Sequence, residues 1–256
     1  MKKKIFAVIL SVIMIIAAVQ PVMSVFAVSS VWSGGTAMPV LSGGYYQINT
    51  AEKLAWFANQ VNSGSPFIKA KLTDDIMLNY SSGRTNQWTP IGSEEHPFKG
   101  EFDGGGHYIS GVYISTAREY SGLFGYVYTQ MPVVDDEDDT TEEIFTANPP
   151  VMIHDLTVRD ANITGLDNTG GIAGYIHYGI IKECSFSGTV TATGNSVGGI
   201  CGYAFNFSRI TQCASSGSVT GNIRTGGIVG YAYANAQINE CYSTCAVRSN
   251  ANVNAG

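Results

Sequence analysis

The sequence predicts an all-β protein built as a parallel β-solenoid, and three observations support this fold class. First, the hexapeptides GGIAGY, GGICGY and GGIVGY begin at residues 170, 198 and 226, so each starts 28 residues after the one before. Second, apolar residues recur with the same period between the hexapeptides. Third, the 256-residue chain contains 30 glycines and only 13% charged residues, a composition that argues against a disordered chain or a coiled coil. This period, without an amphipathic helical pattern, is typical of a solenoid of short strands.

Equivalent residues should stack into ladders, because successive coils pair as parallel strands about 4.8 Å apart. The predicted core ladders are Ile153, Ile181, Ile210 and Ile238; Leu156, Cys184, Cys213 and Cys241; and Ile163, Val190, Val219 and Val247. The predicted corner glycines are Gly170, Gly171, Gly174, Gly198, Gly199, Gly202, Gly226, Gly227 and Gly230, with Gly122 and Gly125 in a looser fourth copy. At a corner, glycine allows either a positive φ or a close approach between backbones. A WD-type propeller has a longer period of about 40 to 45 residues, and the Leu/Asn signature of a leucine-rich repeat is absent.

Residues 1–27 are expected to be a signal peptide, cleaved after Ala27. Three lysines at residues 2–4 precede an apolar run over residues 5–19, and residues 25–27 provide a small-residue cleavage site. The run is shorter than the ~20 residues that span a bilayer, which argues against the alternative of an uncleaved anchor. The net charge of −6 becomes more negative when the three lysines are removed. We therefore expect a soluble mature chain with no nucleic-acid or membrane partner.

Residues 28–108 are expected to form an N-terminal cap and the entry region of the solenoid. Residues 46–64 are predicted to be one helix, with Thr50 as its N-cap and Gly64 at its end. The apolar face of this helix consists of Leu54, Phe57, Ala58 and Val61. A solenoid must protect the open edge of its sheets, so the helix is predicted to cover that edge.

Residues 109–256 are expected to hold the repeats. Ile109, Val112 and Ile114 have the spacing of Ile153, Leu156 and Val158, which predicts an earlier unit that starts near His107. Residues 127–152 interrupt the period and are expected to leave the solenoid as a surface loop. The sequence stops at Gly256, where the next hexapeptide would begin, so we expect a C-terminus truncated within a repeat. Its unpaired sheet edge predicts self-association of the chain.

The chain resembles the GLUG-motif repeat proteins of bacterial surfaces. The hexapeptides carry this resemblance, together with the order of the predicted helix, residues 72–76, residues 88–92 and residues 98–107 before them. The resemblance covers residues 45 to 256. It implies a right-handed, pectate-lyase-like β-helix in an exported protein, of the kind found in adhesin-like proteins and in the non-catalytic part of IgA-specific metallopeptidases. It implies no catalytic residues.

The acidic insertion is the one candidate for a cofactor. Asp135, Asp136, Asp138 and Asp139 offer the carboxylate oxygens that Ca²⁺ prefers, although the spacing and glycine of an EF-hand are absent. The alternative is a solvated run of like charges. No other cofactor or metal is expected.

No catalytic constellation stands out. The zinc-peptidase pattern His-Glu-x-x-His is absent, and the four histidines lack the spacing of metal ligands. Residues 194–198 match Gly-x-Ser-x-Gly formally, but they overlap a repeat turn instead of joining a strand to a helix. A lyase-type site could use Arg159 and Asp160, or Arg209, on an outer face, and solvated surface charge is the alternative.

The five cysteines are interpreted as free thiols, because three of them occupy one ladder position where Leu156 is the alternative residue. A disulfide between stacked coils stays open, since an exported chain permits one. Tyr175, Tyr203 and Tyr231 should form one stack, and Tyr45, Tyr46 and Tyr126 are further tyrosines of interest. Such a stack could bind sugars or a protein, or could simply pack successive coils.

These patterns predict a non-enzymatic, cell-surface adhesion or display module that binds a glycan or protein ligand of a host or its environment. Two enzyme-related alternatives remain. The chain could be the non-catalytic N-terminal region of a larger surface peptidase, or a β-helix enzyme that acts on polysaccharides.

Overall fold

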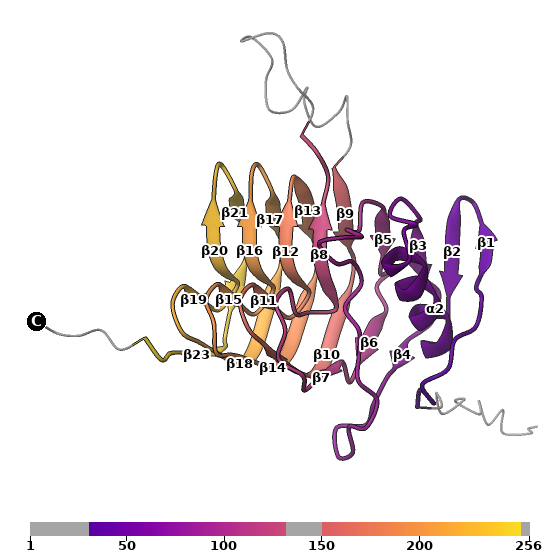
Figure 1. Cartoon of the computed structure of the whole chain (residues 1–256), viewed down its shortest axis with the longest axis horizontal. Coiled ribbons are helices and arrows are strands. Elements are labelled where there is room, and N and C mark those ends of the chain that lie inside the picture. The colour runs from indigo at the N-terminus through magenta and orange to yellow at the C-terminus, as the bar shows by residue number, and fades with distance from the viewer. Residues whose placement is uncertain (1–30, 132–149, 252–256) are drawn as a thin grey trace, which may run out of the picture.

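The computed structural model describes residues 31–131 and 150–251, whose strands wind into a parallel β-solenoid (Figure 1). Four sheets, here named A to D, run along the solenoid. A regular coil contributes one strand to each sheet in turn, as β9, β10, β11 and β12 do before β13 returns to sheet A. The predicted fold class is therefore confirmed.

Sheet A contains β1 (Val40–Ser42), β2 (Tyr45–Ile48), β3 (Ala70–Leu72), β5 (Glu101–Asp103), β9 (Val151–His154), β13 (Gly179–Lys182), β17 (Arg209–Thr211) and β21 (Gln237–Asn239). Sheet B contains β4 (Ile76–Met77), β6 (Tyr108–Ser110), β7 (Tyr113–Ile114), β10 (Thr157–Gly165), β14 (Ser185–Ala192), β18 (Ala214–Gly221), β22 (Tyr242–Ser243) and β23 (Ala246–Ser249). Sheet C contains β11 (Thr169–Gly170), β15 (Val197–Gly198) and β19 (Thr225–Gly226). Sheet D contains β8 (Phe124–Tyr128), β12 (Ala173–His177), β16 (Cys201–Phe205) and β20 (Val229–Tyr233).

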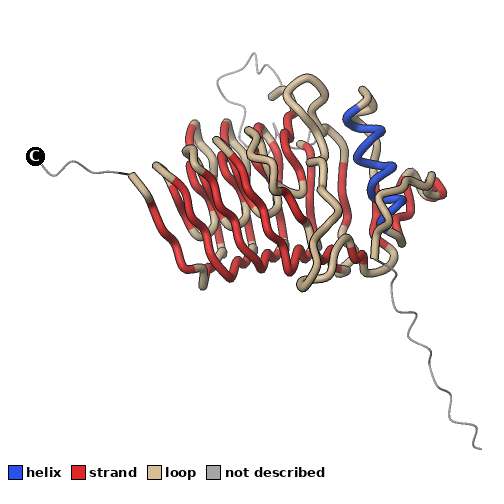
Figure 2. Tube along the Cα trace, turned by 60° about the horizontal axis from the view of Figure 1, so that its bottom comes forward, coloured by secondary structure: helices blue, strands red, loops and turns tan. Residues whose placement is uncertain are grey.

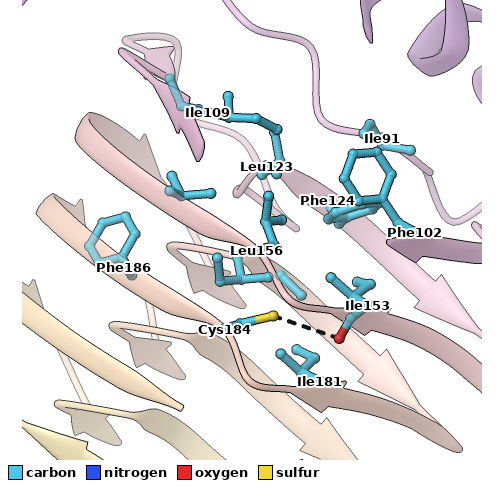
Figure 3. Close-up of a cluster of buried hydrophobic side chains, with 14 of the residues drawn as sticks. Ile91, Phe102, Ile109, Leu123, Phe124, Ile153, Leu156, Ile181, Cys184 and Phe186 are labelled. Carbon is cyan, nitrogen blue, oxygen red and sulfur yellow. Dashed lines mark hydrogen bonds between the residues drawn. The ribbon is translucent and has the colours of Figure 1, made fainter. Parts of the chain in front are cut away.

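The core ladders form in the predicted register. Ile181 on β13 pairs with Ile153 on β9 and with Ile210 on β17. The next coil adds Ile238, which is 39% exposed because it lies in the last described coil, whereas the other three are fully buried. Cys184 lies in the interior among the apolar side chains of neighbouring coils, where its thiol donates a hydrogen bond to the carbonyl of Ile153 at 3.7 Å (Figure 3). All five cysteines are free thiols, as predicted.

The motif glycines are required by close contact between coils and not by backbone conformation. None of the eleven has a positive φ. A Cβ atom on Gly202 would lie 2.5 Å from the amide nitrogen of Thr169 and 2.6 Å from the carbonyl oxygen of Gly174, both in the preceding coil. Positive φ values occur at other positions of the repeats, among them the non-glycine residues that directly follow the sheet A strands, Asp155, Glu183, Gln212 and Glu240.

Helix α2 (Ala51–Asn62) is shorter than the helix predicted over residues 46–64. Residues 45–48 form β2 instead, because they pair in parallel with β3. Thr50 is the N-cap as predicted, and its hydroxyl accepts a hydrogen bond from the amide of Lys53.

The helix packs against the N-terminal end of the core, in the position predicted for the cap. Its predicted apolar face is buried, and the ring of Phe57 packs 6.0 Å from that of Phe98 and 5.9 Å from that of Phe102. The helix lies at one end of the stack of coils (Figure 2). Strand β1, which pairs with β2 in the antiparallel direction, is the outermost strand of sheet A at this end.

The first repeat unit begins near Phe102, which corrects the predicted start near His107. Phe102 pairs with Ile153, and Ile109 pairs with Val158. The prediction was wrong because the spacing of Ile153, Leu156 and Val158 recurs at Val158, Ala161 and Ile163, shifted by five residues. The predicted boundary between residues 108 and 109 therefore falls inside β6.

The insertion is narrower than the predicted range of 127–152, since β8 extends to Tyr128 and β9 begins at Val151. The candidate calcium ligands at residues 135–139 and the predicted signal peptide lie outside the described residues. Within the described part of the chain, no helix has the length and apolar character to cross a membrane.

Candidate functional site

Two columns of aromatic side chains cover the outer face of sheet D. On β12, Ile176 points into the core and is fully buried, so its neighbours Tyr175 and His177 point outward. The parallel register repeats this arrangement on β8, β16 and β20, which lie side by side in Figure 1. The first column is Tyr126, Tyr175, Tyr203 and Tyr231, and the second is Tyr128, His177, Phe205 and Tyr233. We call these eight residues the aromatic face.

The rings contact one another along and between the columns. Ring centroids in the first column are separated by 4.6, 5.4 and 4.9 Å, and those in the second by 4.5, 5.4 and 6.0 Å. These separations follow from the strand spacing of about 4.8 Å. Contacts between columns, such as 5.7 Å between Tyr203 and Phe205, join the two into one continuous surface.

The aromatic face is only partly covered except at His177, which is buried. Its tyrosines in the first column are half-buried, and Tyr233 at the C-terminal end is 57% exposed. Burial, together with the neighbouring tyrosines, raises the pKa of Tyr175 above its usual range. Burial also raises the pKa of Tyr126. The phenols therefore stay protonated at neutral pH and remain hydrogen-bond donors.

Charged groups border the aromatic face at both ends. The guanidinium of Arg224 lies 3.9 Å from the ring centroid of Tyr231, and the ammonium of Lys99 lies 5.8 Å from that of Tyr128. Both are cation–π distances.

A small pocket opens beside the N-terminal end of the first column. Its volume is about 120 Å³, and Asn62, Glu94, Arg118 and Tyr120 contribute to its lining. The ring of Tyr120 meets that of Tyr126 edge-on at 4.8 Å, so the pocket is continuous with the aromatic face. Burial and the charge of Glu94 raise the pKa of Tyr120 to about 12. The pocket thus places a carboxylate, a guanidinium and an amide beside the stacked rings.

A larger groove of about 420 Å³ lies over sheet B, where hydroxyl side chains predominate in the lining. Thr157 and Ser185 hydrogen-bond to each other there at 2.9 Å. The lining contains no ionisable group other than Tyr242, so the groove offers less varied chemistry than the aromatic face.

Of the residues considered for catalysis, Arg159 and Asp160 form an ion pair at 3.8 Å, whereas Arg209 lies apart from them on another sheet. Arg159 stacks on the ring of Tyr108 at 3.3 Å on sheet B, whereas Arg209 lies on β17 in sheet A. Ser196 of the Gly-x-Ser-x-Gly match is buried and is followed by the two-residue strand β15, which excludes a nucleophile elbow.

Sequence reasoning found three rings of the first aromatic column, Tyr175, Tyr203 and Tyr231, but did not place Tyr126 with them and missed the second column. The second column changes identity from coil to coil, so it carries no motif, although an aromatic ring two residues after each motif tyrosine is a detectable signal. Tyr45 and Tyr46 belong to sheet A instead, where Tyr46 packs 5.0 Å from Trp56 of the helix.

Comparison with known proteins identifies the repeats. The family model described as the GLUG motif matches residues 165–191 and 193–220. A crystal structure from Bacteroides ovatus, of a protein provisionally assigned as an immunoglobulin A1 protease, has the same fold with a TM-score of 0.52. The two chains are 15% identical over 79% of this chain and 77% of that one. No curated protein sequence matches the chain. Two consecutive segments of the β-solenoid, residues 165–191 and 193–220, thus match the GLUG motif.

Proposed function

We propose that this chain is an exported, non-catalytic β-solenoid that binds a glycan along its aromatic face. The observation that carries the proposal is the pair of continuous ring columns on sheet D. Tyrosine combines an apolar ring with a hydroxyl donor, which suits the alternating apolar and polar surfaces of a sugar. The regular spacing of the rings suits an extended, repetitive ligand.

The polar pocket beside Tyr120 supports a glycan over a purely apolar partner. Arg118, Glu94 and Asn62 supply charged donors, an acceptor and an amide at one end of the columns. Ligand sites commonly combine an apolar wall with a few such polar groups that fix orientation. In this proposal the pocket holds one polar substituent at the end of the glycan.

The test is a glycan array, run beside a peptide array, with the purified chain and with the variants Tyr203→Ala and Tyr242→Ala. Tyr203 lies at the centre of the aromatic face, and Tyr242 is the matched control, a tyrosine exposed on sheet B. A loss of about 1.4 kcal/mol from one ring would weaken binding roughly tenfold. Tyr203→Ala should show this loss, and Tyr242→Ala should bind like the unmodified chain.

Selective binding to peptides, or binding lost only in Tyr242→Ala, would overturn the proposal. Each array is run with calcium and with a chelator, because the acidic insertion is the candidate calcium site. Calcium dependence that disappears on removal of residues 132–149 would assign the ion to that insertion.

A second candidate is the non-catalytic region of a larger surface peptidase. The shared fold with the Bacteroides ovatus protein favours it. In this case the gene would continue into a peptidase domain, and the aromatic face would position a protein substrate. Sequencing of the complete gene tests this candidate. A peptidase motif downstream of this chain would support it, and a gene without one would contradict it.

A further inference from the structure

A histidine and two aspartates converge on the outer face of sheet A, away from the aromatic face. Asp103 on β5 and His154 on β9 are direct partners in the parallel register. They come from consecutive coils but lie 51 positions apart in sequence, with the acidic insertion between them. The sequence therefore could not reveal them as a pair.

The backbone brings Asp155 to the same side as His154. Adjacent residues of a regular strand point to opposite faces, so the two side chains would normally be separated by the sheet. Asp155 follows the end of β9 and has a φ of 52°, which breaks the alternation. As a result its Oδ2 lies 2.7 Å from Nδ1 of His154.

The three donor atoms have nearly the spacing of a metal site. Nδ1 of His154 lies 3.9 Å from Oδ1 of Asp103, and one ligand atom from each residue falls within 4.8 Å of the others. Tetrahedral ligands of Zn²⁺, at about 2.0 to 2.2 Å from the ion, are separated by roughly 3.4 Å. To reach this separation, the distance from His154 to Asp155 must lengthen from 2.7 Å by about 0.7 Å, and the distance from His154 to Asp103 must shorten from 3.9 Å by about 0.5 Å.

Neighbouring groups already orient these donors. Nε2 of His154 lies 3.3 Å from Oε1 of Glu101, which directs Nδ1 toward the aspartates. A carboxylate on the far nitrogen of a histidine is the usual outer partner of a metal-bound imidazole. The amide of Gly105 donates to Oδ1 of Asp103 at 2.7 Å, and Lys71 pairs with the other oxygen, Oδ2, at 2.6 Å. Oδ1 therefore remains turned toward His154.

We propose that Asp103, His154 and Asp155 bind a divalent transition-metal ion of the Zn²⁺ type. An imidazole nitrogen favours such an ion over Ca²⁺ or Mg²⁺, which prefer oxygen ligands throughout. His154 and Asp103 are mostly covered, with 17% and 16% of their side chains exposed, and Asp155 is 43% exposed. A fourth ligand, water or a donor from a bound molecule, can approach from the side of Asp155.

The combination of metal-binding side chains occurs in one coil, although the positive-φ residue after the sheet A strand occurs in every regular coil. The same positive-φ corner recurs at Glu183, Gln212 and Glu240, but the residues before them are Lys182, Thr211 and Asn239. An acidic corner residue is thus common in this solenoid, and its combination with a histidine and a carboxylate of the adjacent coil occurs at Asp155.

The test is a titration of the metal-free, purified chain with Zn²⁺ by calorimetry and with Co²⁺ by absorption spectroscopy. The variants His154→Asn, Asp155→Asn and Glu101→Gln are compared with two matched controls. His96→Asn replaces a histidine that lies elsewhere, next to Glu95, and Glu240→Gln replaces the equivalent corner acid of the last described coil. Circular dichroism confirms that each variant is folded.

The unmodified chain and both controls should bind one ion. Losing an outer partner of a metal ligand costs about 10- to 100-fold in affinity, so Glu101→Gln should fall in this range and His154→Asn should lose at least as much. No saturable binding by the unmodified chain, or equal affinity in the folded His154→Asn or Asp155→Asn variant, would overturn the proposal. A thiolate charge-transfer band with Co²⁺ would also overturn it, because it would assign the ion to the cysteines. If His154→Asn does not fold, the Zn²⁺ affinities of Asp155→Asn and Glu101→Gln decide whether the proposal holds.

Discussion

Replacing Gly202 with alanine should destabilise the solenoid by about 3 kcal/mol. The added Cβ would lie 2.5 Å from the amide nitrogen of Thr169, 2.6 Å from the carbonyl carbon of Asn168 and 2.6 Å from the carbonyl oxygen of Gly174. Ordinary contacts of this kind exceed 3.4 Å, so two coils must move apart by nearly 1 Å. Overpacking of a core costs about 1 to 3 kcal/mol, and we expect the upper end because all three neighbours are backbone atoms that cannot rotate away.

Urea and thermal unfolding, followed by circular dichroism, measure this effect. For a chain of this size, about 3 kcal/mol corresponds to a Tm lower by roughly 6 to 12 °C. The control is Gly83→Ala, because a Cβ at Gly83 has no heavy atom within 4 Å and its φ is not positive. A Gly202→Ala chain as stable as the Gly83→Ala chain would refute the argument that coil contact explains the motif glycines.

Three further predictions concern the core, one histidine and the thiols. Ile181→Ala should cost about 2 to 5 kcal/mol in urea unfolding, and Ile238→Ala clearly less, because Ile181 is fully buried and Ile238 is 39% exposed; equal losses would show that the last described coil is covered by something else. Burial lowers the pKa of His177, so the unfolded chain binds the extra proton first, and stability should fall by up to about 1.4 kcal/mol per pH unit as the pH drops through ~6.5. His177→Phe, which copies Phe205 of the next coil, should flatten that slope in unfolding curves between pH 7.5 and 5, and an unchanged slope would contradict the assignment. Cys201 is fully buried with a raised thiol pKa, so iodoacetamide should label it only on unfolding and label Cys245 in the native chain, which mass spectrometry reads directly.

The repeats could be predicted from sequence because residues one period apart in sequence lie next to each other in the solenoid. The pairing of Ile153, Ile181 and Ile210 follows from counting alone. The count failed at the first unit, where Ile109 pairs with Val158. The same apolar spacing occurs over residues 153–158 and again over residues 158–163, so it cannot fix the register. Only the long-range pairing of Phe102 with Ile153 resolves it.

Elements outside the period were harder to predict. Tyr46 and Ile48 belong to a strand because β3 and β1 flank them, and no local preference reveals those partners. The candidate sites show the same limit. The second aromatic column varies in identity, as His177 beside Phe205 shows, and the cluster at His154 depends on a residue of the coil before the insertion.

The parallel register also determines how such a protein can change over generations. Each 28-residue unit meets only the coils on either side of it, so an exact duplication inserts a new coil without disturbing the cross-section. Each duplication would add one ring to each aromatic column. Each duplication therefore adds one more set of equivalent contacts. Avidity for a long ligand can rise in this way without any change in the contact made by a single coil.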